Sequence, residues 1–170
     1  MVALNAYFEQ GVALAVDLAN LVGAHRRGTR VVEGERQVPA SVRVVEPQPL
    51  QHLARRMRTI VTASPAAAAA LLNELFTEHS AAPQLAPDGP DWRLHLHPEN
   101  STDEALDAVK AASGLAVLLD QDDWATLKVC AASRCDDVFQ DQSRNLTRRY
   151  CSRTCANRIN AGHARARRLS

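Results

Sequence analysis

Helical spacing of apolar residues dominates the first 120 positions of the chain. It predicts four helices, over residues 8–24, 47–61, 64–76 and 101–119. Ser64 followed by Pro65 is a typical helix start, with an N-cap hydroxyl and a proline in the first turn. Residues 101–104 read as a capping box, which predicts the start of the fourth helix.

One later stretch alternates strictly between apolar and polar residues, as a strand with one buried face does. We expect its apolar residues to face the core and its polar residues to face solvent. The apolar set is Trp92, Leu94 and Leu96, and the polar set is Arg93, His95 and His97. Prolines and a glycine predict a loop over residues 80–91, whereas residues 29–45 fit either two short strands or an ordered loop.

Composition narrows the fold class. Aromatic residues make up only 4% of the chain, so the core must be built from Ala, Val and Leu, which favours helices. We predict an α+β protein that is mainly α. A helical N-terminal domain with a small β-sheet (residues 1–124) precedes a C-terminal module (residues 125–170), which is a hairpin or knuckle followed by a helix.

Neither a membrane helix nor an export signal is visible in the sequence. The longest uncharged stretch is shorter than the ~20 apolar residues that a membrane helix needs. No basic segment precedes an apolar one at the start of the chain. We therefore expect a cytoplasmic protein without a membrane partner.

Charge is distributed unevenly along the chain. Residues 1–125 hold ten Lys/Arg against sixteen Asp/Glu, whereas residues 126–170 hold ten against three. No acidic residue follows Asp141, while eight arginines do. This asymmetry predicts that the C-terminal module contacts a polyanion.

All four cysteines of the chain lie in this basic module. Cys130 and Cys135 form one close pair, and Cys151 and Cys155 form a second pair fifteen residues later. Two close pairs at this separation are typical of a structural zinc site. We expect the first pair on a tight turn and the second pair on one face of a helix's first turn. Four protein thiolates leave zinc no open position, so the predicted Zn²⁺ is structural.

Other interpretations of the cysteines are weaker. Two disulfides suit an exported protein, and no export signal is visible. Neither pair has the Cys-x-x-Cys spacing of a redox site. His163 could replace one ligand, although four thiolates already complete a tetrahedron. No nucleotide-binding, metalloprotease or hydrolase motif occurs, and we therefore expect that the protein is not an enzyme.

The residues around the cysteines resemble the bacterial CGNR zinc-finger family. The resemblance is carried by residues 127–130, 139–145, 148–152 and 155–158. It implies that the four cysteines are the zinc ligands, that an ABATE domain precedes the finger, and that the protein is a stress-responsive transcription regulator that binds DNA. Residues 11–20 are similar to the opening of an ABATE domain. At the Gly position of the family motif this chain has Ala156, while Asn157 and Arg158 match it.

The basic residues of the module are the candidates for contact with nucleic acid, because Arg can pair with phosphate or guanine and Asn with adenine. The candidates are Arg144, Asn145, Arg148, Arg149, Arg153, Asn157, Arg158, Arg165, Arg167 and Arg168. Three simpler roles remain open: a solvated basic face, pairing of Arg144 or Arg158 with Asp136, Asp137 or Asp141, and hydrogen bonding by the asparagines to loop backbone.

The sequence thus favours a DNA-binding regulator whose N-terminal domain senses a small-molecule effector or forms a homodimer. Two alternatives stay open: an adaptor whose finger docks an acidic protein, and an RNA-binding module. Only Phe139 and Tyr150 could stack on unpaired bases in the tail, which is a thin platform for RNA.

Overall fold

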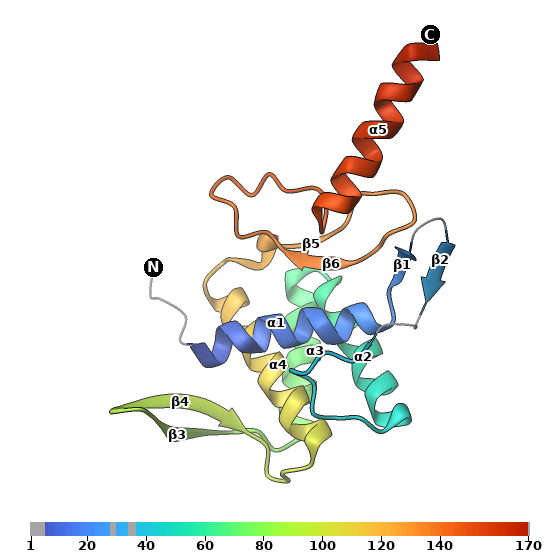
Figure 1. The fold of residues 1–170 in the computed structure, drawn as a ribbon. Helices are drawn as coiled ribbons and strands as arrows, with labels where there is room; N and C mark the ends of the chain where they lie inside the picture. Colours follow the sequence, from blue (N-terminus) through green and yellow to red (C-terminus); the bar gives the residue numbers. More distant parts are fainter. Residues whose placement is uncertain (1–5, 28–29, 34–36, 170) are drawn as a thin grey trace.

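Four helices form the N-terminal domain in the computed structural model, which describes residues 6–27, 30–33 and 37–169. They are α1 (Ala6–Leu21), α2 (Pro47–Val61), α3 (Pro65–Glu78) and α4 (Asp103–Asp120). Helix α4 is the central element and packs against α1, α2 and α3 (Figure 1). All four predicted helices are confirmed. Helix α4 is buried on most of its circumference rather than along one stripe, because neighbours surround it.

Helices α1 and α4 approach each other backbone to backbone, and two glycines make this approach possible. A Cβ on Gly114 would lie 2.4 Å from the backbone N of Val12, and a Cβ on Gly11 would lie 2.4 Å from the carbonyl O of Lys110. Real Cβ atoms do not approach other atoms so closely. The small residues of the two helices therefore set the distance between them.

The N-cap predicted at Ser64 is confirmed, whereas the capping box predicted over residues 101–104 is wrong, because the N-cap of α4 is Thr102 and its N3 residue is Ala105. Ser64 Oγ accepts a hydrogen bond from the backbone N–H of Ala67 at the start of α3. Thr102 Oγ1 accepts one from Ala105 at the start of α4. Each cap satisfies a backbone donor that the first helical turn leaves without a partner.

The loop before α2 is tied to α4 by a buried carboxylate. Asp107 Oδ2 accepts the backbone N–H groups of Arg43 (2.6 Å) and Val44 (3.0 Å). Burial raises the pKa of Asp107, and these two hydrogen bonds oppose the rise. Val42 and Val44 are buried in the core. Residues 37–45 are therefore an ordered loop rather than a strand.

Strands occur as three separate antiparallel hairpins in the described ranges. The pairs are β1 (Ala24–Arg27) with β2 (Arg30–Glu33), β3 (Ala82–Asp88) with β4 (Asp91–His97), and β5 (Leu127–Val129) with β6 (Val138–Gln140). The predicted class, α+β and mainly α, is confirmed. The loop predicted over residues 80–91 is wrong, because strand β3 pairs with β4 along its whole length.

Strand β4 is also oriented differently from the prediction at two of its three apolar residues, whereas Leu96 packs against the core as predicted. Trp92 and Leu94 are 66% and 49% exposed, whereas His95 is half-buried and its ring stacks on Tyr7 with centroids 4.0 Å apart. The Tyr7 hydroxyl donates to the carbonyl O of Leu96 at 2.8 Å. The hairpin thus rests on α1 near its base, while its tip extends beyond the helices (Figure 1), which leaves no core for Trp92 to enter.

The C-terminal module lies against the C-terminal half of α1. Asn20 forms two hydrogen bonds with the backbone of Val138 in β6. Its Nδ2 donates to the Val138 carbonyl O (2.9 Å), and its Oδ1 accepts a hydrogen bond from the Val138 N–H (2.8 Å). The Val138 side chain belongs to the core of the N-terminal domain. Arg58 of α2 forms an ion pair with Asp136 at 3.2 Å. These contacts fix the hairpin β5–β6 on the helices.

Two helical segments complete the module. The 3₁₀ turn η1 (Trp124–Thr126) contains the predicted boundary between residues 124 and 125. Trp124 Nε1 donates to the Ala63 carbonyl O at 3.2 Å. Helix α5 (Arg153–Leu169) ends the chain and projects away from the rest of the molecule (Figure 1). No helix within the described ranges is both long enough and apolar enough to cross a membrane.

Candidate metal centre

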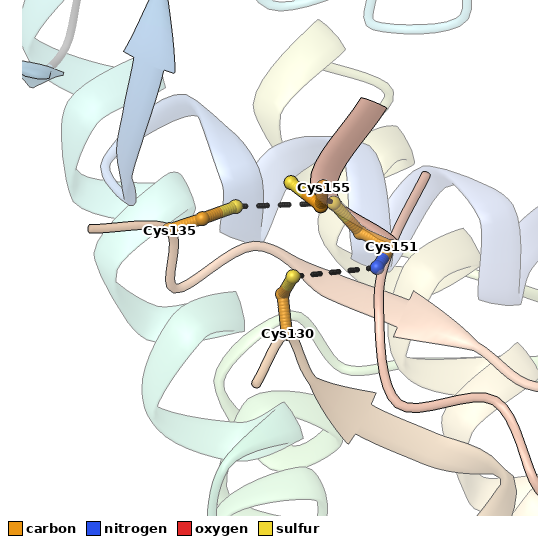
Figure 2. A group of neighbouring side chains, drawn as sticks. All are labelled: Cys130, Cys135, Cys151 and Cys155. Atoms are coloured by element: carbon orange, nitrogen blue, oxygen red, sulfur yellow. Dashed lines mark hydrogen bonds between the residues drawn. The ribbon is translucent and has the colours of Figure 1, made fainter. Parts of the chain in front are cut away.

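The first cysteine pair lies in the loop that connects β5 to β6. Cys130 follows β5 directly, and its N–H donates to the Asp137 carbonyl O at 2.8 Å. The chain then turns, and the N–H of Cys135 donates to the Ala132 carbonyl O at 3.1 Å. Arg134 adopts a φ of 63° in this turn. The predicted tight turn is therefore present, and it brings the two sulfurs to the same side of the hairpin (Figure 2).

The second pair arrives at the start of α5. Cys155 lies in the first turn of the helix, and its N–H is capped by Ser152 Oγ at 3.3 Å. Cys151 precedes the helix, so the prediction that both cysteines share its first turn is wrong. The segment before α5 passes next to the first cysteine pair. The Cys151 N–H therefore donates to the sulfur of Cys130 at 3.4 Å.

The four sulfurs converge on one point (Figure 2). All four Sγ atoms lie within 4.8 Å of one another, with 3.8 Å between Cys135 and Cys151 and 3.7 Å between Cys151 and Cys155. A tetrahedral zinc with Zn–S bonds of about 2.3 Å places its sulfurs about 3.8 Å apart. A disulfide would need about 2.05 Å. The geometry fits one zinc ion held by four thiolates, and it excludes disulfides between these sulfurs.

The environment of the sulfurs disfavours free thiolates. Burial raises the pKa of Cys135 to about 12, and burial also raises the pKa of Cys151. Burial acts in the same direction on Cys155, but hydrogen bonds from Ser152 and the neighbouring thiols outweigh it and lower the pKa of Cys155. A divalent cation supplies the charge that lets all four sulfurs ionise together. Since four protein ligands fill the tetrahedron, the zinc is structural and has no open position for a substrate.

Arg158 of α5 turns toward the metal ligands. Its Nη2 donates to the Ser133 carbonyl O at 3.2 Å and lies 3.7 Å from the Cys155 sulfur. A guanidinium in this position offsets the negative charge of a zinc–tetrathiolate centre and ties α5 to the first cysteine loop. Arg158 thus contacts the metal centre, although the sequence suggested a nucleic-acid contact.

Asp141 organises the loop between the hairpin and the second cysteine pair. This buried carboxylate accepts hydrogen bonds from Lys128 Nζ (2.7 Å), Ser143 Oγ (2.6 Å) and the Arg148 N–H (2.8 Å). Burial alone would raise the pKa of Asp141, but these partners hold it well below its usual range. Lys128 also donates to the carbonyl O of Leu146. Asp141 and Ser143, which form the Asp-x-Ser motif, therefore stabilise the conformation of this loop.

Two of the three acidic residues of the module, Asp136 and Asp141, pair differently from the alternative that the sequence left open. Asp136 pairs with Arg58 of the N-terminal domain and Asp141 pairs with Lys128. Neither ion pair uses Arg144 or Arg158. Both partners, Arg58 and Lys128, escaped prediction because only the tertiary fold brings them to these carboxylates.

The remaining candidate residues form an exposed surface. Its members are Arg144, Asn145, Arg149, Arg153 and Asn157, all exposed to solvent. Arg148 is exposed too, but its guanidinium carbon lies 5.0 Å from the centroid of the Phe139 ring, and its Nη2 donates to the Cys151 carbonyl O at 2.8 Å. Arg165, Arg167 and Arg168 lie on the α5 backbone, and their side chains, like that of His163, fall outside the described residues.

An open groove runs along this surface. It has a volume of about 570 Å³ and begins where the loop meets α5. Its lining comprises Thr147, Arg148, Arg149, Tyr150, Ser152, Arg153 and Ala156. Three of these seven residues are arginines and none is acidic, so the groove is strongly electropositive.

A four-sulfur zinc site between a short hairpin and a basic helix can be compared with known zinc modules. Residues 126–168 match the family model of the CGNR zinc finger. The match covers the whole metal centre and the groove. A search of curated proteins finds no significant match to the chain. The matched segment contains all four sulfurs of the metal centre, those of Cys130, Cys135, Cys151 and Cys155.

Proposed function

We propose that the CGNR finger binds DNA through its arginine-lined groove, and that the chain is a zinc-dependent transcription regulator. The observation that supports this proposal is the groove at the start of α5, with Arg148, Arg149 and Arg153 in its lining and no acidic residue among them. Phosphate oxygens are the natural partners of such a surface, because Arg donates to them through two N–H groups at once.

The position of α5 supports the same proposal. The helix projects from the molecule (Figure 1), and its N-terminal end lies at the groove. The helix dipole favours an anion at that end. The major groove of B-DNA is wide enough to admit an α-helix, and Asn157 lies exposed on the second turn of α5, where it could reach a base edge.

Ala156 lies within this surface. Its half-buried methyl group lines the groove at the position where the family motif has Gly. If a phosphate must approach the backbone here, Ala156→Gly should strengthen binding. If the methyl group is tolerated, the affinity should stay the same while the helix becomes slightly less stable, because Gly is the poorer helix former.

For the remainder of the chain we propose an ABATE-type domain that senses a small-molecule effector or forms a homodimer in a stress response. In this proposal the protein acts in the cytoplasm, where zinc-binding thiols stay reduced, and it is not an enzyme. The support is the resemblance of residues 11–20 and the order of domains.

The test is a titration of the zinc-loaded full chain with DNA, preceded by selection of bound sequences from a random pool. Arg149→Ala and Arg153→Ala should each weaken binding and reduce the slope of log K against log salt by about one unit. Arg55→Ala is the matched control, since Arg55 is exposed on α2, outside the groove.

Two outcomes would overturn the proposal. Enrichment of no sequence, together with tight binding to an acidic protein, would make the finger an adaptor. Preference for unpaired RNA over duplex DNA would make it an RNA-binding module.

A further inference from the structure

A second cavity lies far from the zinc, beneath the β3–β4 hairpin. It has a volume of about 360 Å³, in the range of small-molecule sites. Its walls come from the first turns of α1, the loop before α2, Pro87 of β3, strand β4 with the following Pro98, and α4. The lining comprises Ala6, Tyr7, Gln10, Arg43, Pro87, Arg93, His95, Leu96, His97, Pro98, Leu106 and Lys110.

The charged groups in this lining are all basic. Arg43, Arg93 and Lys110 contribute three cations, and no carboxylate of the described residues lines the cavity. Two acidic groups nearby lie outside its walls and have other partners: Asp107 accepts two backbone N–H groups, and Asp91 pairs with Arg93 at 3.4 Å. The N-terminal domain has more acidic than basic residues, but the charged residues that line this cavity are all basic.

Lys110 is the best-placed cation. Its Nζ donates to Gln10 Oε1 at 2.8 Å and lies 5.8 Å from the centroid of the Tyr7 ring. Burial, and then the charge of Arg43, lower the pKa of Lys110. The charge of Asp107 opposes this shift and already offsets part of the repulsion between the two cations. An anion bound in the cavity would offset more of it, which the neutral Gln10 and the Tyr7 ring cannot do.

Apart from Gln10, the rest of the lining is apolar or aromatic. Leu96, Leu106 and Pro98 offer hydrocarbon surface, and the stacked rings of Tyr7 and His95 form a flat wall. A hydrated inorganic ion would gain little from such walls, whereas a small molecule with an apolar body would be desolvated by them.

We infer that this cavity binds a small organic anion, whose acid group lies between Lys110 and Arg43 and whose apolar body contacts the Leu106 side of the cavity. The inference deepens the proposed sensing role and rests on it for its biological meaning. Binding itself is measured without DNA, so the failure of one proposal can be distinguished from the failure of the other.

The experiment uses the zinc-loaded full chain and three probes: benzoate, its neutral analogue benzamide, and inorganic phosphate. Backbone amide chemical shifts of Tyr7, Gln10 and Lys110 report binding by NMR. We expect a saturable response to benzoate and a far weaker one to benzamide and phosphate. Lys110→Met should weaken benzoate binding about tenfold, as loss of a charged hydrogen bond does. Arg43→Gln serves as a second variant should Lys110→Met fail to fold.

Arg55→Met is the control, because it removes an exposed cation outside the cavity and should leave the benzoate affinity unchanged. The inference is wrong if benzoate gives no saturable shift at these amides, or if benzamide binds as tightly. It is equally wrong if phosphate matches benzoate, since the apolar walls would then contribute nothing.

Discussion

The N-terminal domain and the C-terminal zinc finger (residues 126–168) are stabilised in different ways. The N-terminal domain has a continuous core of leucine, valine, alanine and methionine side chains, gathered around α4. The buried cluster of the finger is three cysteines with Ala132 and Phe139. The finger therefore depends on directed bonds, to zinc and to Asp141, where the N-terminal domain depends on apolar area.

The two regions are nevertheless joined by a shared element. Val138 belongs to the finger hairpin in sequence but to the core of the N-terminal domain in space. Asn20 and Arg58 hold the hairpin from the other side of the boundary. Strand β6 of the finger is therefore held by the helices, whereas the cysteine loop and the start of α5 are held together by the metal site.

Removal of zinc should have the largest effect. Chelation, or Cys155→Ser, deletes an apparent binding free energy of about 10–16 kcal/mol. We expect the amide signals of residues 130–159 to collapse in NMR spectra, while α2, α3 and α4 keep theirs. Thr154→Ala, at an exposed neighbouring position, should bind zinc as the wild type does. Unchanged finger signals after chelation would refute the dependence on metal.

Loss of the Asp141 carboxylate charge should come next. Asp141→Asn leaves Lys128 without its ion-pair partner and weakens the hydrogen bonds to Ser143 and Arg148. We expect the finger to lose zinc to a competing chelator at lower chelator concentration than the wild type does. Asp91→Asn removes an exposed ion pair and should not change this midpoint. Equal midpoints for Asp141→Asn and the wild type would show that zinc alone orders the loop.

The N-terminal domain should be most sensitive at the α1–α4 contact. Gly114→Ala forces the two helices apart and should lower the free energy of unfolding by about 1–3 kcal/mol, as overpacking does. Gly162→Ala is the matched control in α5, because no neighbouring atom of the described residues lies within 4 Å of the place its Cβ would take, and Ala favours helices. Thermal unfolding of both variants measures the difference. Equal stability of the two variants would contradict the close helix contact.

The anchor between the regions should have an effect no larger than that of the α1–α4 contact. Asn20→Ala removes two hydrogen bonds to Val138 and should cost about 1–3 kcal/mol, because the Val138 N–H and carbonyl lose their partners. Hydrogen exchange at the Val138 amide should accelerate, whereas Asn73→Ala on the exposed face of α3 should leave it unchanged. An unaltered exchange rate in Asn20→Ala would mean that zinc and the Val138 side chain suffice to hold the hairpin.

Local signals in the sequence predicted much of this structure. The cap at Ser64, the helical spacing and the cysteine pairs each act within a few residues of their own position, so pattern alone reveals them. The orientation of β4 could not be found in this way. Its alternation is real, but Trp92 faces solvent because the hairpin tip extends beyond the helices.

The contacts between the N-terminal domain and the finger could not be predicted from the sequence either. Asn20 and Val138 are 118 positions apart, and no motif links them. Asp141 was part of the family motif, yet its role emerged only when the fold placed Lys128 and Ser143 beside it. The partner of Asp136 is Arg58, which an amphipathic pattern alone assigns to a solvated face.

We expect the fold of the finger to depend most on one zinc ion, which the four sulfurs from the β5–β6 loop and the start of α5 are placed to bind. Zinc K-edge X-ray absorption of the purified chain, combined with elemental analysis of the same sample, measures this coordination. We predict one zinc per chain and a first coordination shell of four sulfurs at about 2.3 Å. A shell containing nitrogen or oxygen ligands, or a chain that binds no zinc at all, would contradict it.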